Sequence, residues 1–198
     1  MKTICKKQRY VRIIAGISLA VILTAVVLSF LFPGSYESAL DNFFAVKFSK
    51  QINLTSKLVP EEFWAYAAAQ GNSSISEAKA SARELVSSLI INPDFPDSRY
   101  TVTGESKYKG AKLKMIKEYL NDVYGIKPYW VQDCRKVEVL IVTAMSNKSN
   151  EPYSYLMPYD LILIRGKWYV ARCSFNEDET SVSVAFFPDW PLWYEPAY

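Results

Sequence analysis

The hydrophobic pattern divides the chain into an apolar N-terminal run and a longer part in which apolar residues recur periodically. Residues 13–32, IIAGISLAVILTAVVLSFLF, contain no charge. An α-helix of this length spans roughly 30 Å, the thickness of the hydrocarbon core of a bilayer. Residues 1–12 hold only basic charges, which the positive-inside rule keeps in the cytoplasm. We therefore predict a cytoplasmic flank at 1–12, a single transmembrane helix at 13–32 and an extracytoplasmic remainder.

A cleaved signal peptide is the alternative interpretation of the same run. Its apolar stretch is usually about 7 to 15 residues long and ends at a small-x-small site. Here the run is longer, and Phe30, Leu31, Phe32 and Pro33 close it. We favour an uncleaved anchor on the cell membrane, bound to the lipid bilayer through residues 13–32.

Three helical patterns follow the predicted anchor. Apolar residues recur at three- and four-residue steps from Tyr36 to about Lys50, which predicts an aromatic-rich helix. A second helix is expected to start at Pro60 and to end before Gly71. Ser74 and Glu77 form a capping-box pattern for a third. Its expected inner face is formed by Ala78, Ala82, Leu85, Val86 and Leu89.

Strand-like segments begin after the prolines of 92–98. Residues 99–105 alternate as a strand does, and 110–124 have a helical period that ends at Gly125. Further strands are expected within 136–145, 159–164 and 168–173, with a possible strand at 181–187, and we expect 147–153 to form a hairpin loop. Gly166 as the first residue of a two-residue type II′ loop would pair Ile164 with Tyr169, Ile162 with Ala171 and Asp160 with Cys173.

Composition narrows the chemistry. The chain has 23 Lys and Arg, 20 Asp and Glu, and no His, which excludes His-based triads and His-ligated metals. The basic excess belongs to the N-terminal flank, so nucleic acid is not an expected partner. Five lysines between 107 and 117 are expected to form a solvated face; contact with anionic lipid or wall polymer is the alternative. We expect no cofactor and no metal.

The three cysteines are not expected to form a disulfide. Cys5 lies in the cytoplasmic flank, and the predicted strands place Cys134 and Cys173 farther apart than the roughly 7 Å that a disulfide allows between Cα atoms. The tail, residues 177–198, is acidic and then rich in proline and aromatic residues, among them Trp190, Trp193 and Tyr194. These rings are expected to fold back on the domain; contact with a partner, a membrane interface or a sugar is the alternative.

The order of elements predicts an α+β fold in which a curved antiparallel sheet wraps around helices, over residues 35–176. The chain resembles the nuclear transport factor 2-like (cystatin-like) superfamily, in particular membrane-anchored extracytoplasmic members from Gram-positive bacteria. The resemblance lies in ALDNFFAVKFSK (39–50), LVPEEFWAYAA (58–68), KLKMIKEYLNDVYGI (112–126) and GKWYVA (166–171). It implies a cone-shaped domain whose concave sheet face forms a pocket or a homodimer interface.

Three functions follow from these patterns. We expect a non-enzymatic, single-pass extracytoplasmic module that binds a protein, a peptide or an envelope component through the sheet face or the tail. An envelope assembly component, similar to an inner-membrane protein of type IV secretion, is the first alternative. A small-molecule enzyme of the ketosteroid isomerase-like type is the second, since the resemblance implies Asp, His and Tyr in a pocket, of which this chain lacks His. Asp160, Tyr169 and Cys173 would share one face in the expected register.

Overall fold

In the described chain, three α-helices precede the first strand, and a fourth connects the first strand to the second. The computed structural model describes residues 34–49, 51–89, 98–142 and 154–186. Its helices are α2 (Glu37–Ser49), η1 (Ile52–Lys57), α3 (Glu61–Gln70), α4 (Ile75–Leu89), α5 (Gly110–Tyr124) and η2 (Pro128–Trp130), of which η1 and η2 are 3-10 helices. Its strands are β1 (Arg99–Lys107), β2 (Val131–Val142), β3 (Ser154–Ile164), β4 (Lys167–Phe175) and β5 (Val182–Phe186). They form one antiparallel sheet in the order β1-β2-β3-β4-β5, so the α+β class is confirmed.

The predicted helix ends are confirmed where local chemistry sets them. The Ser74 amide donates to the Glu77 carboxylate at 2.7 Å and the Glu77 amide donates to the Ser74 hydroxyl at 3.2 Å, which is the capping box expected before α4. Gly125 ends α5 in the left-handed conformation, with φ of 71°. On α4, Ala82 and Val86 are buried, but Leu85 is 46% exposed, so the inner face is narrower than expected.

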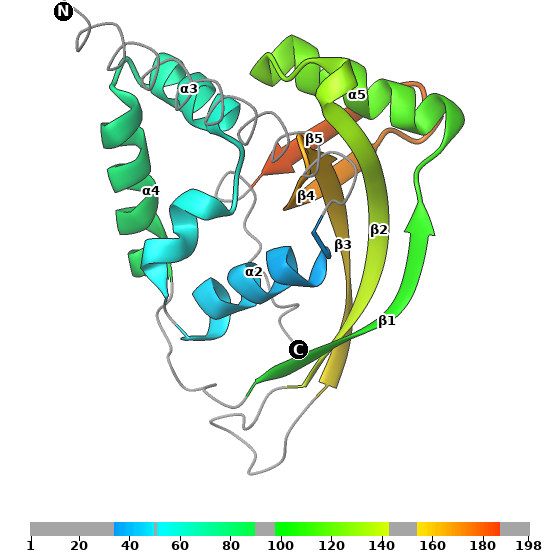
Figure 1. The fold of residues 1–198 in the computed structure, drawn as a ribbon, viewed down its shortest axis with the longest axis horizontal. Coiled ribbons are helices and arrows are strands. Elements are labelled where there is room, and N and C mark those ends of the chain that lie inside the picture. The colour runs from blue at the N-terminus through cyan, green and yellow to red at the C-terminus, as the bar shows by residue number, and fades with distance from the viewer. Residues whose placement is uncertain (1–33, 50, 90–97, 143–153, 187–198) are drawn as a thin grey trace, which may run out of the picture.

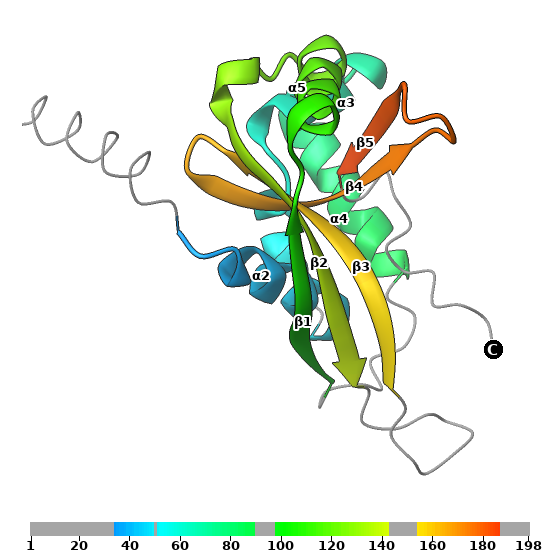
Figure 2. The ribbon, with the colours of Figure 1, turned by 90° about the vertical axis from the view of Figure 1, so that its right-hand side faces the viewer.

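The sheet divides into two parts along β3. Residues 154–164 of β3 pair with β2 nearly throughout, whereas β4 pairs only with Asp160 to Ile164. β1, β2 and the first half of β3 therefore continue past β4 and β5 as a three-stranded arm, visible in Figures 1 and 2. β5 matches the strand suggested for residues 181–187 and pairs with β4 from Ala171 to Phe175.

The turn between β3 and β4 corrects the predicted register. The two-residue loop is Arg165–Gly166, and both residues have positive φ, 50° and 78°. Positive φ at both positions is the type I′ geometry, rather than the type II′ turn expected with Gly166 first. Asp160 therefore pairs with Ala171, not with Cys173, and Ile162 pairs with Tyr169. The prediction was wrong because it assigned the first loop position, which needs positive φ, to Gly166. In the structure Arg165 occupies the first position and Gly166 the second.

Helix α2 lies on the concave side of the sheet (Figure 1), and its aromatic side chains contact the sheet. Phe43 and Phe44 contact Tyr159 of β3, with ring centroids 5.5 and 5.7 Å apart, and Phe44 stacks on Tyr100 of β1 at 4.5 Å. A second cluster joins Phe63 of α3 to Phe186 of β5. In the described residues, protein side chains thus occupy the concavity next to α2.

The structure describes no helix that is both long and apolar enough to span a bilayer, and the anchor predicted at 13–32 lies outside the described residues.

Candidate functional site

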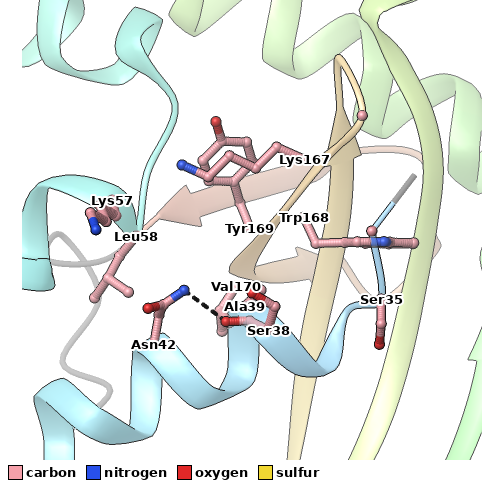
Figure 3. A pocket seen from close by; sticks show the side chains of 12 residues that line it. Ser35, Ser38, Ala39, Asn42, Lys57, Leu58, Lys167, Trp168, Tyr169 and Val170 are labelled. Atoms are coloured by element: carbon pink, nitrogen blue, oxygen red, sulfur yellow. Dashed lines mark hydrogen bonds between the residues drawn. The ribbon is translucent and has the colours of Figure 1, made fainter. Parts of the chain in front are cut away.

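A pocket lies between the start of α2, the end of η1 and the tip of the β3–β4 hairpin (Figure 3). Its volume is about 110 Å³. Trp168, Tyr169 and Val170 of β4 form one wall, and Leu58 with Ala39 forms an apolar part of the other. The hairpin turn positions the β4 wall, because the type I′ loop returns the chain directly beside β3.

Two lysines give the pocket a positive character. Lys57 and Lys167 line it, and none of its lining residues is acidic. In Figure 3 the Lys167 side chain runs across the Tyr169 ring toward the side of the pocket where Lys57 lies, and its ammonium is 5.0 Å from the ring centroid. Partial burial and then the charge of Lys57 lower the pKa of Lys167, while Glu61 opposes them.

The nearest carboxylates are engaged by other cations. Glu61 binds Lys79 through both oxygens, at 2.9 and 3.0 Å, and Glu62 forms an ion pair with Arg165. Arg165 also lies flat on Trp130, with its guanidinium 3.9 Å from the ring centroid. A second cavity of about 210 Å³ adjoins these groups and shares Lys167 and Tyr169 with the first. With the described residues, neither Lys57 nor Lys167 forms an ion pair.

A charged cluster supports Trp168 from behind the pocket. The guanidinium of Arg135 on β2 lies beside the rings of Trp168 and Tyr36, 5.1 and 5.7 Å from their centroids, and these two rings also contact each other edge to face at 6.0 Å. It binds Glu105 at 2.6 Å and Asp133 at 2.8 Å. Burial would raise the pKa of Asp133, but hydrogen bonds from Arg135 and Lys107 lower it. This cluster joins the start of α2 to β1, β2 and β4, and so fixes the pocket wall.

Asp160, a predicted site residue, does not line this pocket. Its side chain forms hydrogen bonds within the sheet region instead. Its carboxylate accepts the Tyr108 hydroxyl at 2.6 Å and the Cys173 amide at 2.6 Å. The described β3–β4 pairing stops at Asp160, and Pro158 is the next residue of β3 on that face. The carboxylate therefore takes up an amide of β4 at the point where the two strands separate.

The protonation chemistry of this cluster follows from its burial. Burial raises the pKa of Asp160, and the hydrogen bonds from Cys173 and Tyr108 act against it without cancelling it. Burial and the Asp160 carboxylate raise the pKa of Tyr108. Both carboxylate oxygens are engaged within the protein, so the cluster holds the sheet rather than presenting a free base.

The predicted site residues are thus only partly brought together. Tyr169 lines the pocket, whereas Asp160 and Cys173 meet beside Tyr108. Trp190, Trp193 and Tyr194 lie outside the described residues. Cys134 and Cys173 form no disulfide in the described residues; they lie on β2 and β4, which are separated by β3. In the described ranges, no group of three Cys, Asp or Glu side chains is placed to hold a metal.

Two further surfaces carry apolar side chains. A groove of about 460 Å³ lies between α3 and α4 and is lined by Phe63, Trp64 and Leu85 among others. Leu156 and Val142, on the outer end of the arm, are 54% and 38% exposed.

The lysines at 107–117 are partly neutralised: Lys107 pairs with Asp133, Lys112 with Glu179 and Lys114 with Glu118.

Sequence reasoning missed the lysine pair because its members are 110 residues apart and belong to no motif. The one local signal was the Arg-Gly-Lys-Trp run at 165–168, which marks an exposed turn with cations on both sides of a glycine.

Fold and site together define a small α+β domain with a cationic, aromatic-walled pocket beside its first helix. Comparisons with protein-family models, with curated proteins and with solved structures give no match to the chain.

Proposed function

We propose that the chain is a non-enzymatic, membrane-anchored binding module with a nuclear transport factor 2-like domain on the outer side of the cell membrane. The observation that carries the proposal is the position of the pocket. Gly34 and Ser35 line it, and they follow the apolar run 13–32 almost directly. If this run spans the bilayer, the pocket lies near the membrane surface and faces ligands of the envelope.

The chemistry of the pocket favours binding over catalysis. Its walls offer aromatic surface and two ammonium groups, which can hold and orient a ligand. Asp160, the residue on which an isomerase-like reaction would depend, keeps both oxygens in hydrogen bonds to Tyr108 and Cys173. A general base needs an oxygen within reach of the proton that it removes.

Thiol labelling of the full chain in intact bacterial cells tests the topology. We would introduce Lys109→Cys, at an exposed position before α5, and treat the cells with a membrane-impermeant maleimide. The introduced thiol should react in intact cells, and the chain should sediment with membranes after alkaline extraction. The native Cys5 serves as the matched control and should react only after the cells are permeabilised.

Two results would refute this proposal. One is protection of the introduced thiol at position 109 in intact cells together with labelling of Cys5. The other is recovery of the full chain from the soluble fraction. Burial raises the pKa of Cys134 and Cys173, so both thiols should react slowly, and labelling of the chain without Lys109→Cys gives their background.

A further inference from the structure

The pocket beside α2 combines features that favour one class of ligand. Lys57 comes from the end of η1 and Lys167 from the start of β4, so the fold brings two ammonium groups from distant segments to one cavity. Like charges at a short distance repel each other, and a bound anion relieves that repulsion. The closest acids are already paired, Glu61 with Lys79 and Glu62 with Arg165, and the charge of Glu61 offsets the repulsion at Lys167 only in part.

The number of free cations among the described residues of the pocket favours one class of anion. Arginine and lysine both bind carboxylates and phosphates, so the type of cation does not separate the two. The guanidinium of Arg165 is held by Glu62 and Trp130 and does not line the first cavity. The cations that remain there are two ammonium groups, and a phosphate monoester balances their charge because it carries about 1.5 to 2 negative charges near neutral pH.

The size and the walls of the cavity limit the size and polarity of the part of the ligand that is attached to the phosphate. A single water needs roughly 10–15 Å³ of such volume, so about 110 Å³ admits a group of several heavy atoms and no large ring system. Leu58, Trp168 and Val170 give an apolar lining that suits the short carbon part of a phosphate ester.

We propose that Lys57 and Lys167 form a binding site for the phosphate group of a small phosphate ester, in the pocket between α2 and the β3–β4 hairpin. This site does not depend on the membrane topology proposed above, and it sharpens that proposal by naming the chemistry of the ligand. Both a glycerol phosphate in solution and the headgroup of phosphatidylglycerol offer anionic phosphate oxygens to it. The first is a monoester with about two negative charges, and the second is a diester with one.

Binding to the full chain in phosphatidylcholine nanodiscs tests the site. Inorganic phosphate and glycerol 1-phosphate would be titrated by calorimetry at low salt, because screening weakens exposed charges. We expect saturable binding of both probes and at least about a tenfold loss of affinity in Lys57→Gln/Lys167→Gln. The variant Lys57→Arg/Lys167→Arg keeps the charge and should retain most of the affinity for phosphate.

A charge-matched variant controls for the general field of the protein. Lys109→Gln/Lys127→Gln removes two positive charges from exposed positions outside the pocket and should bind like the wild type. Thermal unfolding of each variant checks that the domain still folds. Equal losses in the two glutamine variants, or no binding of either probe by the folded wild type, would overturn the proposal.

Nanodiscs that contain phosphatidylglycerol separate the two sources of phosphate. If they compete with glycerol 1-phosphate for wild-type protein, the site takes the lipid headgroup; if they do not, it takes the soluble ester. Failure of the topology test with retained phosphate binding would refute the anchored module and leave this site intact. Correct topology without phosphate binding would refute the phosphate site and leave the anchored module intact.

Discussion

Replacement of Asp160 by alanine tests whether this carboxylate holds the sheet together where β3 and β4 separate. Asp160→Ala removes the acceptor of two hydrogen bonds, from the Tyr108 hydroxyl and the Cys173 amide, both at 2.6 Å. A buried donor that loses its partner costs roughly 1–3 kcal/mol. Tyr108 is half-buried, so its hydroxyl can turn partly to water. We expect the free energy of unfolding to fall by about 2–4 kcal/mol.

Two further variants make the Asp160 experiment specific. Tyr108→Phe removes one donor and keeps the carboxylate, so it should cost less than Asp160→Ala, about 1–2 kcal/mol. Glu138→Ala removes an exposed carboxylate from β2 and should stay within about 0.5 kcal/mol of the wild type. Urea unfolding followed by circular dichroism gives all three values. A loss below about 0.5 kcal/mol for Asp160→Ala would refute the structural role.

The pH dependence of the same comparison gives an independent check. Burial raises the pKa of Asp160 above its ordinary value of 3.8 in the folded protein. At a pH between the ordinary pKa and the raised pKa, the carboxyl of Asp160 keeps its proton in the folded protein and has lost it in the unfolded chain. The contribution of Asp160 to the free energy of unfolding therefore decreases as the pH rises. The advantage of the wild type over Asp160→Ala should therefore shrink from pH 3.8 upward. An advantage that grows with pH would contradict the raised pKa.

Three more outcomes follow from single contacts. Burial raises the pKa of Cys134 to about 12, so a thiol reagent should modify it only after denaturation, and fast modification of the folded protein would contradict this. Gly166→Ala should cost about 1–2 kcal/mol in urea unfolding, because φ of 78° strains any residue with a Cβ. Arg135→Lys should lower the thermal stability by about 1 kcal/mol, since an ammonium group cannot keep the contacts of the guanidinium with two rings and two carboxylates at once. Unchanged melting would refute this argument for Arg135.

The helix ends could be predicted from local chemistry, but the pairing of distant strand residues could not. The capping box at Ser74, the stop at Gly125 and the period of α5 depend on residues within one or two turns, and each was placed correctly. The register of the β3–β4 hairpin depended on which residue tolerates positive φ. Arg165 does so here because its side chain is held by Glu62 and Trp130, 103 and 35 residues away. No local pattern contains that information.

The candidate site shows the same limit. Tyr169 was predicted to lie in the concavity of the sheet with Asp160 and Cys173, whereas the pocket that it lines lies at the tip of the β3–β4 hairpin beside α2. The register was wrong by two residues, and such a shift keeps Asp160, Tyr169 and Cys173 on one face of the sheet. Asp160 is nevertheless bound to Tyr108 and to the Cys173 amide, away from the pocket. Lys57 had no distinguishing signal at all, since its role depends on where the fold brings η1 relative to β4. A residue whose function comes only from spatial neighbours is not recognisable in a single sequence.

Arg165 determines which charges remain available at the pocket, although it does not line the first cavity. Its guanidinium holds Glu62, which lines the second cavity together with Lys167. In Arg165→Ala the Glu62 carboxylate is released, and Lys167 is the lysine beside it. We therefore expect Arg165→Ala to weaken phosphate binding, and Arg165→Ala/Glu62→Gln to restore it, because the competing carboxylate is then neutral. Titration of the four proteins of this cycle with inorganic phosphate measures the coupling between the two residues. Equal affinity in Arg165→Ala and the double variant would mean that Glu62 does not compete for Lys167.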